Sequence, residues 1–444
     1  MVTEANRIPI DPHSHAALAA NDLELGLVDT SDIAAVSAWL RSDSRGFHAP
    51  EPSADYLAGR AAELGESNDR VTGVWDRPAT EGAEPVATIW SWEMGLTVPG
   101  GESIDAWAIS SVTVAPTHRR RGIARALLTA ELRTARLAGS ALAMLTVTEA
   151  TIYGRYGFGP AAWQAPYTID TKGLRWTGPV PDGRVRFISP GDLFEIAPDV
   201  YDRARVRIPG ETDRRVDTWK RILGLAPSVP SEDTRDIRAV VYRDAEQRVQ
   251  GYAVYRFEGH EETSVLHLVD LCFTTDDAYS ALWRFLVEMD LTNTISAPRR
   301  NVVEPVIWQV NNPRAIRKTD QRDQLWLRIL DVPRVLSART YAAPGIFVFT
   351  VHDELEFAHG QYVLEVSPTG HGSVTELSPS SVHQQADAVT VTLTVNDLAS
   401  LYLGGATAES LAQSGRLTGL SPNAAQVLDR SFASPRSPHL STWF

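Results

Sequence analysis

Three consecutive arginines and a glycine lie between two apolar segments, and this combination of residues could bind a phosphate group. The residues are Arg119, Arg120, Arg121 and Gly122. A loop that enters a helix leaves amide hydrogens unpaired beside the positive end of the helix dipole, and such an end binds phosphate readily. The guanidinium groups add charge-assisted contacts to phosphate oxygens, and a glycine lets ligand and backbone approach closely. The sequence therefore predicts a phosphate-binding loop at this position.

The segments on either side of this loop predict a strand before it and a helix after it. The β-branched residues Ile109, Val112 and Val114 indicate a strand, which should end before Pro116 because proline has no amide hydrogen for a ladder. After the loop, apolar residues recur at helical spacing: Ala124, Leu127, Leu128, Leu132 and Ala135. This strand–loop–helix order would place the arginines at the helix N-terminus.

The spacing Arg119-x-x-Gly122-x-Ala124 resembles the (Gln/Arg)-x-x-Gly-x-(Gly/Ala) loop of the GNAT (GCN5-related) N-acetyltransferases, which holds the pyrophosphate of acetyl-CoA. The alternative is a solvated basic turn. The elements predicted around the loop follow the order β-α-α-β-β-β-α-β-α, which is the GNAT order. The resemblance therefore implies a catalytic GNAT domain over residues 23–178, and we expect residues 1–22 to form a loose tail.

Beyond a Pro- and Gly-containing linker at residues 179–183, the chain repeats the same pattern. Residues 265–273 correspond to the strand before the loop, and residues 281–286 correspond to the helix after it. Asp276 and Asp277 stand in place of the arginines. Acidic side chains suit a helix N-terminus but would repel a pyrophosphate. We therefore expect a second GNAT-like domain over residues 184–332 that binds no cofactor.

The remainder of the chain has a third pattern, of predicted strands followed by helices. Its stretch over residues 393–405 resembles the sterol-carrier-protein fold. The expected fold class is α+β: two tandem GNAT domains, each with a mixed central sheet and flanking helices, and then a sterol-carrier-protein-like α/β domain over residues 336–444 that ends in the C-terminal carboxylate.

This domain order, together with the stretches at residues 115–122 and 152–160, resembles the Eis (enhanced intracellular survival) family. The resemblance implies an acetyl-CoA-dependent N-acetyltransferase that acts on primary amines, aminoglycosides first and at several positions, and that assembles as a hexamer. Two alternatives stay open. The acceptors could be protein lysines or polyamines, or the chain could be a non-catalytic protein that binds acetyl-CoA and lipid.

The resemblance also implies which residues hold the cofactor. Backbone groups of Val112, Thr113 and Val114 would bind the pantetheine arm of acetyl-CoA, and Thr148 and Glu149 would line the far wall. The residues expected around the pyrophosphate are Arg119, Arg120, Arg121, Gly122, Ile123, Ala124 and Arg125.

Acetyl transfer to an amine requires two proton transfers, because the ammonium must lose a proton and the leaving thiolate needs one. Family members place the general acid at the tyrosine that corresponds to Tyr153, and the alternative is a buried structural tyrosine. They use the terminal carboxylate as the base, which here is Phe444. Two aromatic residues at the end of the chain indicate a buried terminus, although an aromatic tail that only packs would look the same.

The substrate pocket is where the sequence departs from the aminoglycoside-acetylating relatives. Residues 44–48 occupy the place of an acid-containing loop, the penultimate residue Trp443 is not an acid, and Ser111 stands where a larger aromatic residue can occur. Fewer carboxylates would weaken the binding of polycationic sugars. The candidates for substrate contacts are Trp39, Phe47, His48, Ser111 and Trp443.

Composition sets the remaining limits. A chain of 444 residues is too long for one core, and 43% hydrophobic with 22% charged residues is typical of a globular protein. A net charge of −13 argues against nucleic-acid binding. The chain lacks a run of about 18 apolar residues, a signal peptide and Cys/His metal spacing, and its one cysteine, Cys272, lies in an apolar run. We expect no membrane span, no metal and a cytoplasmic location, with export lacking a recognisable signal as the alternative.

Overall fold

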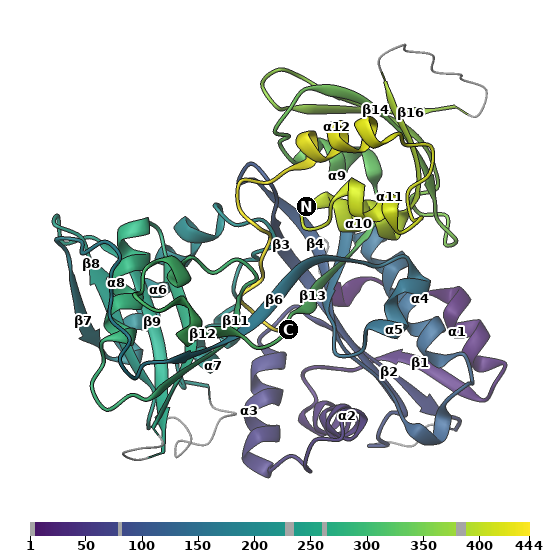
Figure 1. The fold of residues 1–444 in the computed structure, drawn as a ribbon. Coiled ribbons are helices and arrows are strands. Elements are labelled where there is room, and N and C mark those ends of the chain that lie inside the picture. Colours follow the sequence, from purple (N-terminus) through teal and green to yellow (C-terminus); the bar gives the residue numbers. More distant parts are fainter. Residues whose placement is uncertain (1–4, 79–81, 227–234, 260–263, 379–387) are drawn as a thin grey trace.

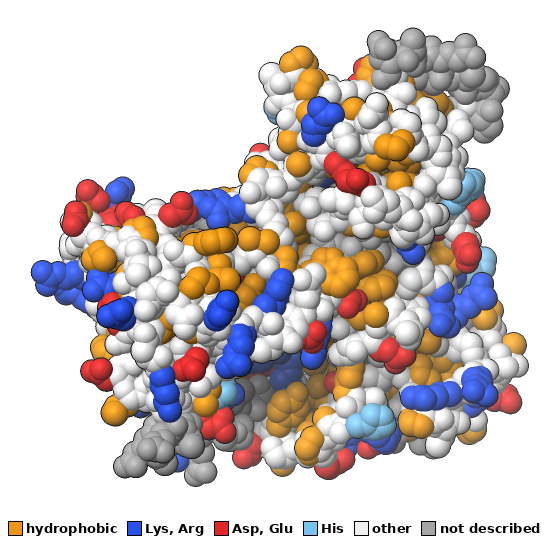
Figure 2. All heavy atoms as spheres, in the orientation of Figure 1, with side chains coloured by type: hydrophobic (Ala, Val, Ile, Leu, Met, Phe, Trp, Pro, Cys, Tyr) orange, Lys and Arg blue, Asp and Glu red, His pale blue; other side chains and the backbone are white. Residues whose placement is uncertain are grey.

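The computed structural model describes residues 5–78, 82–226, 235–259, 264–378 and 388–444. Its helices and strands form three lobes that meet close to the last residue of the chain (Figure 1). On the face shown in Figure 2, acidic and basic side chains are scattered over all three lobes.

The elements are named in chain order. The first part contains η1 (Ala5–Arg7), α1 (Pro12–Ala19), β1 (Leu23–Leu27), α2 (Ile33–Gly46), α3 (Ala54–Gly65), β2 (Arg70–Asp76), β3 (Ala87–Thr97), β4 (Ser103–Val114), η2 (Pro116–His118), α4 (Ile123–Ala138), β5 (Leu142–Thr146), α5 (Ala150–Tyr153), η3 (Gly154–Tyr156) and β6 (Gly159–Asp170). The second part contains β7 (Arg184–Ile188), α6 (Pro190–Arg205), α7 (Val216–Ile222), β8 (Arg238–Arg243), β9 (Val249–Glu258), β10 (Val265–Phe273), α8 (Asp276–Val287), β11 (Thr294–Asn301), η6 (Pro305–Trp308), η7 (Pro313–Ala315), β12 (Ile316–Lys318) and β13 (Arg322–Ile329). The third part contains α9 (Val332–Ala338), β14 (Gly345–His352), β15 (Gly360–Val366), β16 (Gly372–Leu377), β17 (Val389–Thr394), α10 (Val395–Tyr402), α11 (Ala408–Gln413) and α12 (Pro422–Phe432).

One mixed sheet runs through the first and second parts, in the order β1-β2-β3-β4-β5-β13-β6-β11-β10-β9-β8-β7, and β12 pairs with β6. In the first part, β1 to β4 pair antiparallel and β4 pairs parallel with β5. In the second part, β7 to β10 pair antiparallel and β10 pairs parallel with β11. The pairing pattern therefore repeats, as the sequence comparison of the two halves predicts.

Strand β13 joins the two halves, because it is the last strand of the second part and pairs between β5 and β6. Trp326 lies opposite Leu145 on one side and opposite Pro160 on the other. Leu325 and Leu327 are fully buried in one hydrophobic cluster, and Trp326, 8% exposed, is buried in the other. Burial on both faces is what a central strand requires.

The two faces of the first sheet pack against different partners, since successive residues of a strand point to opposite faces. Trp107 and Ile109 of β4 lie in one hydrophobic cluster with residues of α4. Ala106 and Ala108 lie in the other cluster, which also contains residues of α2, α3 and the third part. The third part has its own sheet, in the order β16-β15-β14-β17. Its core is continuous with that of the first part, and this fixes the third part on the α2–α3 face.

Residues 5–19 are not the loose tail that we expected from the sequence. They form η1 and α1, and Leu18 of α1 is 2% exposed. Asp11 caps α1 by accepting a hydrogen bond from the Ser14 amide at 2.8 Å, and it pairs with Arg133 of α4 at 2.9 Å. The prediction was wrong because α1 is short and mixes alanines with histidines, so its sequence shows little amphipathic periodicity.

Candidate active site

Strands β4 and β5 diverge partway along their length. They pair only from Ala106 opposite Leu142 to Ile109 opposite Leu145. Beyond that point β4 has a register shift against β3, at Ser111, whose φ is +53°. The Thr88 hydroxyl group donates to the Ser111 carbonyl oxygen at 2.8 Å and holds the distorted strand. The divergence opens a cleft between β4 and β5.

The edge of β4 that faces this cleft is formed by Val112, Thr113 and Val114. Strand β3 pairs with the other edge of β4, and β5 pairs with β4 only as far as Ile109. In the part of the chain that the structure describes, no strand therefore pairs with this edge at Val112–Val114. A strand edge of this kind offers alternate N–H and C=O groups to an amide-bearing ligand. The three residues thus lie where the sequence prediction requires them.

Helix α4 follows β4 after η2 and the arginine loop, and its N-cap residue is Gly122. Gly122 has φ of +77° and provides no side-chain cap. A Cβ atom at this position would have no neighbour within 4 Å, so the space in front of the helix is open. The helix is anchored from behind by Ile123, which is 2% exposed. Open space and uncapped amide groups at a helix N-terminus fit a phosphate group.

The arginines of the loop do not all point the same way. Arg119, Arg120 and Arg125 are exposed. Arg121 instead donates to the Asn21 carbonyl oxygen at 2.6 Å and lies 3.6 Å from Asp76. Its side chain therefore braces the loop against the end of the β1–β2 pair, and of the three consecutive arginines Arg119 and Arg120 are the two exposed ones.

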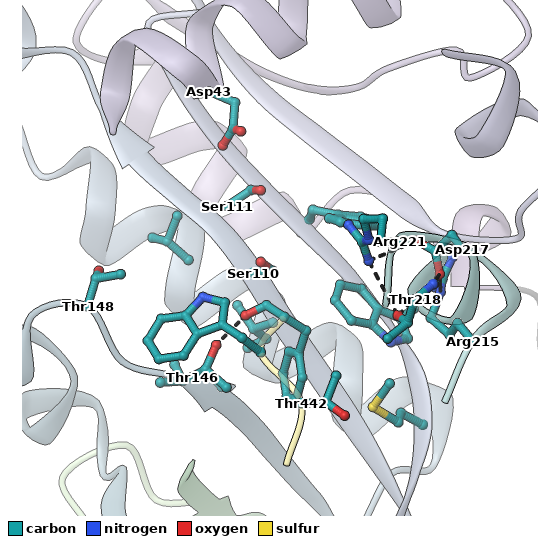
Figure 3. A pocket seen from close by; sticks show the side chains of 18 of the residues that line it. Asp43, Ser110, Ser111, Thr146, Thr148, Arg215, Asp217, Thr218, Arg221 and Thr442 are labelled. Atoms are coloured by element: carbon teal, nitrogen blue, oxygen red, sulfur yellow. Dashed lines mark hydrogen bonds and ion pairs between the residues drawn. The ribbon is translucent and has the colours of Figure 1, made fainter. Parts of the chain in front are cut away.

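The far side of the cleft is formed by the residues that follow β5. Thr148 is exposed and lines a cavity of about 320 Å³, which we call the central cavity. Glu149 is the N-cap residue of α5 and accepts a hydrogen bond from the Thr151 hydroxyl group at 2.6 Å. Figure 3 shows the central cavity with Thr146, Thr148 and Thr442 around it.

Tyr153, at the end of α5, lines the central cavity and is 7% exposed. Burial, together with the charge of Glu149 and the proximity of Tyr156, raises the pKa of Tyr153 to about 12. The hydroxyl group is therefore protonated at neutral pH and can donate a proton to a leaving group. Tyr156, three residues further along the chain, is buried and does not line the central cavity.

The chain returns to this cavity at residues 433–444, which we call the C-terminal tail. The Thr146 hydroxyl group donates a hydrogen bond to the Phe444 carbonyl oxygen. The Phe444 ring meets the Trp92 ring edge-on, with 5.6 Å between ring centroids. Gln324 of β13 donates to the Thr442 carbonyl oxygen at 2.9 Å. The end of the tail thus lies beside the same cavity as Tyr153.

A buried arginine of the second part holds the tail. Arg214 pairs with Asp270 at 2.6 Å, and it donates to the Ser441 hydroxyl group at 2.8 Å and to the Thr442 hydroxyl group at 3.1 Å. Glu211 accepts a hydrogen bond from the Ser441 amide at 3.1 Å. The roles of Arg214 and Glu211 could not be predicted from the sequence, because their partners are far away in the chain.

The expected substrate contacts are placed unevenly. Phe47, Ser111 and Trp443 line the central cavity. Trp39 does not: it is 2% exposed, and its indole N–H donates to the Thr72 carbonyl oxygen at 2.9 Å, so it is a core residue. His48 does not line the cavity either, because the chain turns outward after α2 and leaves its side chain exposed.

The central cavity holds more charge than we expected from the sequence. Asp43 stands just before the segment at residues 44–48 that we considered poor in acids, and burial raises its pKa to about 6. The other charged residues in the lining are Asp213, Asp217, Arg60, Arg215 and Arg221. Three carboxylates thus line the cavity, and two of them, Asp213 and Asp217, come from a segment distant in sequence from Asp43.

The second part has a related cleft, with the C-terminal tail beside it. Strands β10 and β11 pair only from Val265 to His267 on β10. Asp276 begins α8 and lies 3.5 Å from Arg436 of the tail. A cavity of about 670 Å³ at this place is lined by strand, helix and tail residues, among them Tyr279, Arg300 and His439. The tail therefore runs past this cleft on its way to the central cavity.

Among the described residues, no group of three or more His, Cys, Asp or Glu side chains could hold a metal ion. The helices of the described residues include none long and apolar enough to cross a membrane. Cys272 is buried.

Models of known domain families match all three parts of the chain. Acetyltransferase (GNAT) domain models match residues 28–161 and residues 210–329, and a sterol carrier protein domain model matches residues 332–441. These matches confirm the fold class that the sequence predicts.

Relatives with the same organisation cover most of the chain. An N-acetyltransferase of Streptomyces griseus, described as uncharacterized, is 35% identical over 411 residues, which are 90% of this chain and 95% of its own. The N-acetyltransferase Eis of Mycobacterium tuberculosis is 32% identical over 362 residues, which are 80% of this chain and 85% of its own.

Solved structures agree with these relatives. Eis1 from Mycobacterium abscessus superposes with a TM-score of 0.77 at 26% identity, and the match covers 95% of this chain and all of that one (100%). A GCN5-related N-acetyltransferase from Anabaena variabilis, at 19% identity, gives a TM-score of 0.77 over 95% of this chain and 100% of its own, and it shows the same fold.

Proposed function

The chain belongs to the Eis family of GNAT N-acetyltransferases, and on that premise we propose that it transfers an acetyl group from acetyl-CoA to primary amines. The observation that carries this proposal is the convergence of the diverging strand β4, Tyr153 and Phe444 on one cavity. An active site for acetyl transfer needs all three features: a place for the coenzyme, a proton donor for its thiolate and an acceptor for the proton of the amine.

Acetyl-CoA would supply an acetyl group activated as a thioester. The uncapped N-terminus of α4 and the exposed side chains of Arg119 and Arg120 would bind its diphosphate. The free edge of β4 would pair with the amide groups of its pantetheine arm, as a strand added to a sheet does. Thr148 would close the opposite wall.

Tyr153 would give its proton to the departing thiolate. Its raised pKa, about 12, keeps the hydroxyl group protonated over the whole physiological pH range. In a chain that ends at Phe444, the terminal carboxylate would take the proton of the ammonium group. Thr146 holds this group by a hydrogen bond, and Trp92 holds the ring beside it.

The acceptor class within primary amines is part of the proposal. Aminoglycosides are the first candidates because of the family, and protein lysines and polyamines are the second. A non-catalytic role has less support, since Tyr153 and the end of the tail both lie at the cavity.

A homo-oligomer, with a hexamer as the first candidate, also belongs to this proposal. Its support in the structure is two exposed apolar side chains on the second part, Trp308 at 84% and Val303 at 66% exposure. Large apolar side chains exposed together often mark an interface. Light scattering on the purified protein would give the mass of the assembly.

The test is thiol release from acetyl-CoA across a panel of primary amines, with the acetylated product identified by mass spectrometry. We expect amine-dependent release. A chain without Phe444 should lose most of this activity, whereas Phe444→Leu, which keeps a carboxylate at the same position, should retain it. Absence of release with every amine, from a folded protein that binds acetyl-CoA, would refute the proposed function.

A further inference from the structure

Three arginines surround one carboxylate at one end of the central cavity. Asp217 lies 3.6 Å from Arg60, 3.3 Å from Arg215 and 3.3 Å from Arg221. Arg60 comes from α3, whereas Arg215, Asp217 and Arg221 come from α7 and its N-cap. Figure 3 shows Arg215, Asp217, Thr218 and Arg221 gathered on one side of the cavity, away from Asp43 and Thr148.

The other carboxylates that pair with these arginines do not line the cavity. Glu63 pairs with Arg60, and Asp69 pairs with Arg215 at 2.7 Å. All three arginines line the cavity. Of the carboxylates that pair with them, Asp217 lines it and Glu63 and Asp69 do not. Burial would raise the pKa of Asp217, yet the charges of Arg221, Arg215 and Arg60 hold it below the ordinary value. Within this cluster, the cavity lining therefore includes three guanidinium groups and one carboxylate.

The part of the cavity around Asp43 is suited to an amine. Figure 3 shows Asp43 away from the arginines, and the same cavity lining includes Tyr153 and Phe444. The Oδ1 atom of Asp43 is buried and has no hydrogen-bond partner among the described residues. The Ser111 hydroxyl group faces the same carboxyl group. An amine bound here would meet negative charge and would lie beside the proposed acid and base.

Aromatic rings lie next to the arginine cluster. Trp90 and Trp92 both line the cavity, with 4.5 Å between their ring centroids. The guanidinium group of Arg215 lies over both rings, 5.6 Å from the centroid of Trp90 and 5.1 Å from that of Trp92. A guanidinium group held over an aromatic surface retains little mobility that binding would still have to restrict.

We propose that the acceptor carries a carboxylate as well as the amine, and that it is an amino acid or a short peptide whose carboxylate binds to Arg60, Arg215 and Arg221. This inference rests on the proposed function and names its substrate class. The planar fork of an arginine binds a carboxylate through two parallel hydrogen bonds. A polycationic sugar has no anionic group that could bind to these guanidinium groups.

The reaction balances without any further reactant. The amine nitrogen forms a bond to the acetyl carbon, and the bond between that carbon and sulfur breaks. The ammonium group loses one proton to the base before the attack, and the nitrogen loses a second proton by the same route once its bond to carbon has formed. The base passes both protons to solvent. The thiolate receives the proton of Tyr153, which is regained from solvent, so one proton is released in the overall reaction. The carboxylate of the acceptor is unchanged, so its contribution is to binding and orientation.

The experiment compares amines that differ only in the carboxylate: lysine against cadaverine, tryptophan against tryptamine, and a dipeptide against its amide. Kanamycin represents the polycations, and phosphoethanolamine against ethanolamine tests for a different anion. We expect kcat/KM to be about tenfold or more higher for the carboxylated member of a pair, mainly through KM.

The variant Arg221→Gln should reduce that preference about tenfold through KM, since one charge-assisted contact is lost. Arg221 is suited to this test because its side chain is 38% exposed, so its loss should not prevent folding. Lys220→Gln is the matched control, because Lys220 lies on the same helix and does not line the cavity. It should keep the full preference.

The inference fails if decarboxylated amines or kanamycin are acetylated equally well or better, if phosphoethanolamine is preferred to the carboxylates, or if Arg221→Gln leaves the preference intact. In those cases thiol release still depends on an amine, and the proposed function stands. If no amine gives thiol release, the proposed function itself is wrong, which makes the two failures distinguishable.

Discussion

The hydroxyl group of Thr146, at the end of β5, donates a hydrogen bond to the carbonyl oxygen of Phe444, 298 residues further along the chain. Thr146 belongs to the strand that diverges from β4, and Phe444 is the tip of the C-terminal tail. One contact thus links the wall of the cleft to the group that we propose as the base.

Replacing this contact should lower the rate of acetyl transfer. In Thr146→Val the tip of the tail loses its partner, and a hydrogen bond of about 1 kcal/mol corresponds to a fall of about fivefold in kcat/KM. Thr146→Ser keeps the hydroxyl group and should retain the activity. Steady-state kinetics with any amine that is acetylated would compare the three proteins. Equal rates for the valine and serine variants would mean that Thr146 does not position the tail.

Ser441 should hold the tail in place, because it binds both Arg214 and Glu211. The variant Ser441→Ala leaves these buried groups with one partner fewer, which should destabilise the attachment of the tail by about 1 kcal/mol. We expect faster hydrogen exchange of the amides at residues 439–444 and a lower kcat.

Ser437→Ala is the control for this prediction, since the contact of Ser437 runs through its carbonyl oxygen, which accepts from Asn301 at 2.9 Å. This variant should exchange as the parent does. If Ser441→Ala also exchanged as the parent does, the Arg214–Glu211 anchor would be dispensable.

The two glycines that cap α4 allow a matched comparison. Gly122 has φ of +77° and Gly139 has φ of +88°, and a Cβ atom at either position would have no neighbour within 4 Å. An alanine at either position should therefore cost a similar free energy of unfolding, about 1–2 kcal/mol, because of the left-handed backbone. Only Gly122→Ala should also raise the KM for acetyl-CoA, since Gly122 alone faces the cleft.

Urea denaturation and steady-state kinetics on both variants would check this comparison. An equal rise in KM in the two variants would show that general destabilisation, and not the loop, causes the effect.

Because of Asp43, we expect the free energy of unfolding to be larger in mild acid than at neutral pH. Its pKa in the folded protein is about 6, above the ordinary value of 3.8, because burial disfavours the charged form. Between these two values the folded protein holds a proton that the unfolded chain has released, so the free energy of unfolding falls as the pH rises through this window. Above about pH 6 the full cost of burying the charge is present.

The variant Asp43→Asn lacks this cost, so it should be more stable than the parent at pH 7.5 and should lose that advantage by about pH 4. Thermal unfolding at a series of pH values would measure the difference. A constant difference across the series would mean that Asp43 does not titrate in the folded protein as its surroundings imply.

Local sequence signals were enough to predict the strand, the loop and the helix at the proposed coenzyme-binding cleft. Alternation of β-branched residues ending at Pro116, followed by a glycine and a helical repeat, was sufficient for β4, the loop and α4. These signals lie within a short window of sequence, in which neighbouring residues determine the conformation. The repeat of the pattern around Asp276 was visible for the same reason.

Contacts between distant segments could not be predicted in this way. The sequence does not show that β13 pairs with β5, or that Arg60 and Arg221 meet at Asp217, because these depend on how separate elements pack. Trp39 illustrates the opposite error, since an aromatic residue near the expected pocket turned out to be a core residue. The helix α1 was missed because its residues carry no clear periodicity.

The most direct test of the account is the single-turnover rate of acetyl transfer in Tyr153→Phe, measured together with the affinity for acetyl-CoA. Tyr156→Phe serves as the control, because Tyr156 is buried nearby and does not line the central cavity. Loss of the proton donor predicts a rate at least about 100-fold lower with unchanged affinity. A rate within about twofold of the parent, from a folded variant that binds acetyl-CoA normally, would contradict the role that we assign to this tyrosine.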